Sequence, residues 1–98
     1  MFEIGGKYIC GGRTFWCVDI DGCVDLCSAG SHIFVEKDSA MFKKVGQLEP
    51  GQSYKARLSF SDFKKRDSYT VKAVQGREVL LSNGVGIPLD IFASMFYE

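Results

Sequence analysis

The chain has 98 residues, 46% of them hydrophobic and 24% charged, which are values of a globular domain and argue against disorder. Its twelve basic and twelve acidic side chains cancel, so binding that depends mainly on phosphate contacts is disfavoured. No stretch has the apolar length of a membrane span or the pattern of a signal peptide, and we therefore expect a cytoplasmic protein with its four cysteines as free thiols.

The first predicted strand lies within Phe2–Cys10 and ends at Gly11-Gly12. Arg13–Ile20 and Cys23–Ser28 are expected to form a tight hairpin, because Asp21-Gly22 between them is a signal for a two-residue turn. This turn sets a register that places Ile20 opposite Cys23, Asp19 opposite Val24, Val18 opposite Asp25, Cys17 opposite Leu26 and Trp16 opposite Cys27.

Side chains alternate between the two faces of a strand. One face of this hairpin should therefore carry Phe15, Cys17, Val24 and Leu26. The other face should carry Trp16, Val18, Ile20, Cys23 and Cys27.

Beyond the hairpin, His32–Glu36 is expected to form a fourth strand with Ile33 and Val35 pointing inward. Asp38-Ser39 can cap a single helical or 3₁₀ turn, in which Met41 and Phe42 close one end of the unit. A last short strand, 43–45, is followed by a joining segment at 46–51.

The segment Thr14–Gly30 returns as Ser68–Gly84 at an offset of 54 residues, and the match continues to the end of the sequence. Upstream, Gly5 and Tyr8 match Gly51 and Tyr54 at an offset of 46. A repeat of this length is typical of a duplicated supersecondary unit. The difference between the offsets places an insertion in the second copy, within Leu58–Asp67.

The second copy repeats the predicted plan. Its strands are expected at Gln52–Arg57, Ser68–Val74, Arg77–Ser82 and Gly86–Leu89, with a closing turn at Asp90–Phe96. Three pairs of positions stay apolar in both copies and should form the common core: Phe15/Tyr69, Cys17/Val71 and Leu26/Leu80. The face of Trp16 is apolar only in the first copy, so the other copy, a dimer mate or a partner must cover it.

Short strands, a tight central hairpin and a one-turn helix before the last strand are the layout of an SH3-like small barrel. Gly86–Phe92 resembles the glycine, proline and aromatic ending of that fold, and Leu58–Asp67 resembles its RT loop. The resemblance implies an all-β protein of two tandem SH3-like barrels, residues 1–46 and 47–98, packed as one compact body. The sequence lacks an ALYDY-like stretch and paired tryptophans, which peptide-binding members of the superfamily use for proline-rich ligands.

The residues that could carry chemistry do not form a recognisable site. Cys10, Cys17, Cys23 and Cys27 lack the short CxxC-type spacing of structural zinc sites, and the hairpin separates Cys17 from the next two thiols. Small buried hydrophobic side chains are the favoured interpretation of these cysteines. A nucleophile and base such as Cys10 and His32 are not brought together by spacing. We therefore expect no catalytic residues, no metal site and no cofactor.

The strongest binding signal is a basic and aromatic cluster in and around the insertion: Phe60, Phe63, Lys64, Lys65, Arg66, Arg57 and Lys72. It favours docking on another protein, because aromatic and arginine anchors supply much of interface energy. Stacking on single-stranded nucleic acid is the second interpretation, and sequestration of a small molecule between the barrels is the third. A rival docking surface is Trp16, Val18 and Ile20. The neutral charge and small size suit a phage or mobile-element protein that modulates or inhibits a host enzyme, while the oligomeric state stays open.

Overall fold

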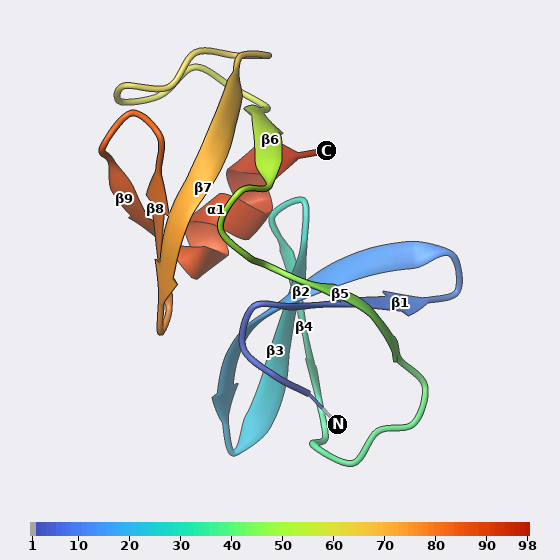
Figure 1. Cartoon of the computed structure of the whole chain (residues 1–98). Coiled ribbons are helices and arrows are strands. Elements are labelled where there is room, and N and C mark those ends of the chain that lie inside the picture. Colours follow the sequence, from blue (N-terminus) through green and yellow to red (C-terminus); the bar gives the residue numbers. More distant parts are fainter. Residues whose placement is uncertain (1) are drawn as a thin grey trace.

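The computed structural model describes residues 2–98 and contains two five-stranded antiparallel sheets and one short helix (Figure 1). The prediction of an all-β protein is confirmed. The first sheet has the order β4-β3-β2-β1-β5, and the second has the order β10-β6-β7-β8-β9. The elements are β1 Gly6–Cys10, β2 Arg13–Asp21, β3 Cys23–Ser28, β4 Ser31–Val35, β5 Lys43–Gln47, β6 Ser53–Ala56, β7 Ser68–Gln75, β8 Glu78–Leu81, β9 Gly86–Pro88, α1 Leu89–Met95 and β10 Phe96–Tyr97.

Both halves of the chain connect their strands in the same way. In each half the fifth strand lies beside the first, and the remaining strands follow in sequence order. Tyr8 lies opposite Phe15 in the first sheet, as Tyr54 lies opposite Tyr69 in the second. The sequence matches at the two offsets therefore correspond to equivalent positions in the first two strands of each sheet.

Two glycines before these strands also play the same role. Gly5 and Gly51 have φ angles of 84° and 95°, a region that other residues enter only with strain. The backbone N–H of Gly5 donates to the carbonyl of Cys17, and that of Gly51 donates to the carbonyl of Val71, at 2.8 Å in both cases. Each glycine thus ties the entry of its half to the second strand.

A β-bulge in β2 makes part of the predicted hairpin register wrong. Trp16 and Cys17 pair with Cys27 and Leu26 as expected, but the register shifts between Cys17 and Asp19, so that Ile20 pairs with Val24. The bulge adds one residue to β2 and reverses the facing of side chains beyond it. Ile20 consequently packs on the core of the first sheet, and Cys23 is exposed.

The second sheet has a bulge at the matching place, between Val71 and Ala73. Its hairpin turn is one residue longer than that of the first sheet, since Gln75 pairs with Glu78 whereas Asp21 pairs with Cys23. The ungapped sequence match therefore fails beyond the turn. Leu81, and not the predicted Leu80, opposes Val71 and is fully buried.

The helical turn predicted at the end of the first half does not form. Residues 36–42 make turns and bends, with the Ser39 N–H donating to the Glu36 carbonyl at 3.1 Å. Met41 is 75% exposed, whereas Phe42 packs on the first core. No apolar residues at helical spacing favour a helix there.

The second half does form its closing helix, because α1 has an apolar face. Leu89, Phe92 and Ala93 have the spacing of one helical face, and all three are buried. The helix contacts β2 and β3 of the first sheet as well as β8, β9 and β10, and Figure 1 shows it where the two halves meet.

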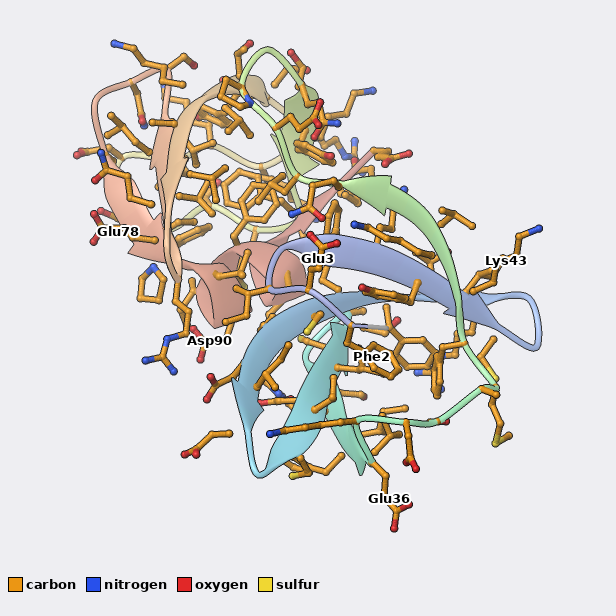
Figure 2. All side chains as sticks on the ribbon, turned by 60° about the horizontal axis from the view of Figure 1, so that its bottom comes forward. Phe2, Glu3, Glu36, Lys43, Glu78 and Asp90 are labelled. Atoms are coloured by element: carbon orange, nitrogen blue, oxygen red, sulfur yellow. The ribbon has the colours of Figure 1, made fainter. Side chains whose placement is uncertain are left out.

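The molecule has two hydrophobic clusters. The smaller lies within the first half and comprises Phe2, Tyr8, Phe15, Cys17, Val24 and Leu26. Figure 2 shows Phe2 inside this half, while Glu36 and Lys43 point away from it. The larger cluster belongs mainly to the second half, yet it contains Trp16, Val18 and Cys27 of the first. The two halves therefore share one core.

The Trp16 side chain makes the central contact of this shared core. Its ring centroid lies 6.0 Å from that of Tyr54 and 6.3 Å from that of Phe92, with edge-to-face geometry in both cases. Aromatic pairs at these distances contribute beyond the area that they bury. The second half thus covers the apolar face of β2, one of the three ways of covering that the sequence left open.

Among the described residues, no helix has the length and apolar character needed to cross a membrane.

Replacing Phe92 by alanine should destabilise both halves together. Truncating a buried phenylalanine costs about 3–5 kcal/mol, so we expect a decrease of that size in the free energy of unfolding. Denaturant unfolding should be followed by Trp16 fluorescence and by far-ultraviolet circular dichroism, whose transitions should coincide.

The control is Ile91→Ala on the exposed side of the same helix, which should cost less than about 1 kcal/mol. A Phe92→Ala variant whose Trp16 transition stays in place while the dichroism transition moves would contradict a shared core.

Candidate functional site

The inserted segment Leu58–Asp67 is a folded loop. The backbones of Phe60 and Phe63 exchange hydrogen bonds of 3.1 and 2.8 Å, and the Arg66 N–H donates to the Ala56 carbonyl at 2.8 Å. The Lys64 N–H donates to the Tyr69 hydroxyl at 2.8 Å. The loop is thereby tied both to itself and to the strands on either side of it.

Phe63 anchors this loop in the core. Its ring is only 1% exposed and lies 4.9 Å from the ring of Tyr69 and 5.3 Å from that of Phe96. Phe60 is half-buried against it, at 5.0 Å between centroids. In this structure the Phe63 ring therefore packs in the core and is not on the surface of the loop.

The basic residues of the predicted site are on the surface. Lys64, Lys65 and Arg66 are exposed, and among residues 2–98 the structure gives none of them an ion-pair partner. Leu58 beside them is 53% exposed. The loop thus presents three adjacent cations and one apolar side chain to solvent.

The other two predicted basic residues lie outside the loop. Arg57, at its base, holds its guanidinium 5.3 Å from the ring centroid of Tyr97. Lys72 lies in the bulge of β7 and is exposed. The structure therefore groups Lys64, Lys65 and Arg66, and it places Arg57 directly after β6 and Lys72 on β7.

The residues of the rival docking surface, Trp16, Val18 and Ile20, are buried or half-buried in the structure. Trp16 is 9% and Val18 is 3% exposed, and both lie in the shared core. Ile20 packs on the first core instead, because of the bulge. In this conformation the second half covers Trp16 and Val18 except where Trp16 lines a cleft, and Ile20 is half-buried on the first core.

A cleft between the two halves was not predicted. It has a volume of about 320 Å³, and its lining includes the cations Lys7, Arg13 and Arg57 together with the rings of Trp16, Tyr54, Phe96 and Tyr97. The Lys7 ammonium lies 5.6 Å from the Trp16 ring centroid and pairs with the Glu98 carboxylate. We call this the cationic cleft. Its residues are far apart in the sequence, so no local motif could have indicated it.

Tyr54 in this cleft has a perturbed hydroxyl. Burial, and secondarily the negative charge of Glu98, raise its pKa to about 12. The hydroxyl donates to Oε1 of Gln52 at 2.9 Å. Tyr54 therefore stays neutral at physiological pH and contributes an uncharged side chain to the lining of the cleft.

A second cleft between the halves has the opposite charge. It measures about 260 Å³ and is lined by Asp19, Asp25 and Asp90 with Arg77. Arg77 pairs with Asp19 at 2.7 Å across the two halves. His32 pairs with Asp25 at 2.7 Å, so this histidine is engaged by a carboxylate and not by Cys10.

The cysteines occupy separate environments. Cys17 and Cys27 are fully buried in different clusters, Cys10 is half-buried and Cys23 is exposed. Burial raises the pKa of the Cys17 thiol to about 11. Over residues 2–98, the structure contains no group of three or more histidine, cysteine or acidic side chains arranged to hold a metal ion.

Comparison with known proteins does not assign the chain to a family. No family model, curated protein or solved structure matches it.

Thiol alkylation of the native protein should distinguish these environments. Iodoacetamide at pH 8 should modify Cys23 first, because a pKa near 11 leaves only about a thousandth of Cys17 as thiolate and burial blocks access. Mass spectrometry of digested samples identifies the modified residue.

Cys17 and Cys27 should react at the rate of Cys23 once denaturant unfolds the chain, which is the internal control. Equal modification of Cys17 and Cys23 in the native protein would contradict the described burial.

Proposed function

We propose that the chain is a non-enzymatic binding protein built from two SH3-like barrels, and that it docks on another protein. The support for the two barrels is the common strand order, the bulge at matching places and the glycine contacts of Gly5 and Gly51. The inserted loop follows the first strand of the second half, where SH3-like folds carry their RT loop. The halves then form one rigid platform that holds this loop.

The observation that carries the docking proposal is the anchored cationic loop. Phe63 fixes the loop in the core, and backbone hydrogen bonds order the segment that bears Lys64, Lys65 and Arg66. A preordered loop loses little conformational entropy on binding. Its three unpaired cations beside Leu58 fit an acidic protein surface with an apolar centre.

Protein is favoured over nucleic acid as the partner of this loop. Stacking platforms for unpaired bases need open aromatic faces, whereas Phe63 is buried and Phe60 is half-buried. The net charge of zero also provides little long-range attraction for a polyanion.

Charge reversal in the loop tests this proposal. The double variant Lys65→Glu/Arg66→Glu should reduce capture of the partner protein from a lysate of the source cells at least about ten-fold, the cost of one hot-spot residue. Quantitative mass spectrometry of the captured material measures the reduction. Both side chains are exposed, so the free energy of unfolding should change by less than about 0.5 kcal/mol per substitution.

The matched control is Lys37→Glu/Lys43→Glu, which changes the net charge equally on an exposed part of the first half. Equal capture of the partner protein by the loop variant and by the control would contradict the proposal. Binding of single-stranded oligonucleotides that falls steeply with salt and is lost in the loop variant would support the nucleic-acid alternative instead.

A further inference from the structure

The cationic cleft is a second surface, separate from the inserted loop, and its charges are unbalanced. Three of its lining residues are cationic, Lys7, Arg13 and Arg57, and one is acidic, Glu98. A volume of about 320 Å³ is within the usual range of ligand sites. The excess of positive charge in a partly enclosed space favours an anionic occupant.

Aromatic rings of the cleft hold two of the three cations, Lys7 and Arg57, in position. Lys7 lies over Trp16 and Arg57 over Tyr97, at 5.6 and 5.3 Å from the ring centroids, and both rings line the cleft. The Arg13 guanidinium instead lies 5.5 Å from the ring of Phe15, which packs in the core of the first half on the other face of β2. Cation–π contacts of this kind restrain long side chains before any ligand arrives. The cleft is therefore preorganised for an anion.

Glu98 shows which anion the cleft accepts. Its carboxylate pairs with the Lys7 ammonium, and its side chain is 62% exposed whereas that of Lys7 is 22% exposed. The exposed carboxylate of Glu98 thus pairs with a lysine whose side chain is mostly buried. An ion pair with one exposed partner is weak, so an incoming carboxylate can displace it.

We infer that the cationic cleft binds an acidic peptide segment of a partner protein, and that Glu98 occupies the Lys7 position until this segment replaces it. An additional carboxylate of the segment would pair with Arg57, for which arginine's planar donors are suited. Trp16, Tyr54 and Phe96 are nearly completely buried and leave no open faces for base stacking, which disfavours nucleic acid. The inference concerns residues outside Leu58–Asp67, so it stands or falls independently of the proposed loop.

Trp16 provides the measurement, because it is the sole tryptophan and lines the cleft. An oligoglutamate peptide with blocked ends should be titrated into the full chain at low salt while Trp16 emission is recorded. Glu98→Gln should tighten binding by about two- to five-fold, since it removes a competing exposed ion pair. Lys7→Gln and, separately, Arg57→Gln should weaken binding by about ten-fold, the usual effect of losing a charge-assisted contact.

Glu36→Gln, Lys43→Gln and the loop variant Lys65→Gln/Arg66→Gln are the controls, and all three should bind the peptide as the wild type does. The last control separates failure of the cleft from failure of the loop. Melting curves identify any variant that unfolds, and Arg57→Gln keeps the test decisive if Lys7→Gln does so.

Four binding results would each overturn the inference, and self-association would be a fifth. They are unchanged affinity in Glu98→Gln, full affinity in Arg57→Gln, equal binding of free glutamate at the same carboxylate concentration, and tighter binding of an oligothymidine than of the peptide. Self-association in place of peptide binding, seen by sedimentation, would also contradict it.

Discussion

The packing of Trp16 against Phe92 and Tyr54 is the contact on which the rest of the structure depends. Strand β2 gives Phe15 and Cys17 to the core of the first half and Trp16 and Val18 to the core that both halves share. A unit of roughly 45 residues buries too little apolar surface to be stable alone. Because of the shared core, each half is stable only when the other is folded. The same core also holds the walls of the cationic cleft in place.

The same contact explains why the two halves differ although their strands are connected alike. The second half forms α1 before its last strand, and the buried residue Phe92 of this helix contacts Trp16 of β2 in the first sheet. The corresponding part of the first half has no second sheet to cover, and residues 36–42 form turns instead of a helix. Burial against a neighbour, more than local propensity, decides where a short helix forms.

Much of the fold could be predicted from the sequence. Alternating apolar residues and glycine turns indicated the strands. The prediction that Phe15 and Leu26 lie on a buried face was correct. The bulge after Cys17 could not be predicted, because an inserted residue leaves no mark in a pattern of period two and is selected by packing on both faces. The extra residue of the bulge changes the face on which Ile20 lies, and the longer second turn puts Leu81 in the position predicted for Leu80.

The candidate site was less predictable than the fold. Lys64, Lys65 and Arg66 were correctly expected on a loop, but the burial of Phe63, which anchors that loop, was not anticipated. Two aromatic residues in one short loop are a signal that at least one of them packs inward. The cationic cleft joins residues from both ends of the chain, so its existence depends on how the halves meet.

Native-state hydrogen exchange tests the shared core most directly. Amides of β2 in the first sheet and of β7 in the second should open in one cooperative event, with the same free energy and the same dependence on denaturant. Opening of β2 at a clearly lower free energy than β7, with its own denaturant dependence, would show that the halves are separate units and would contradict the account.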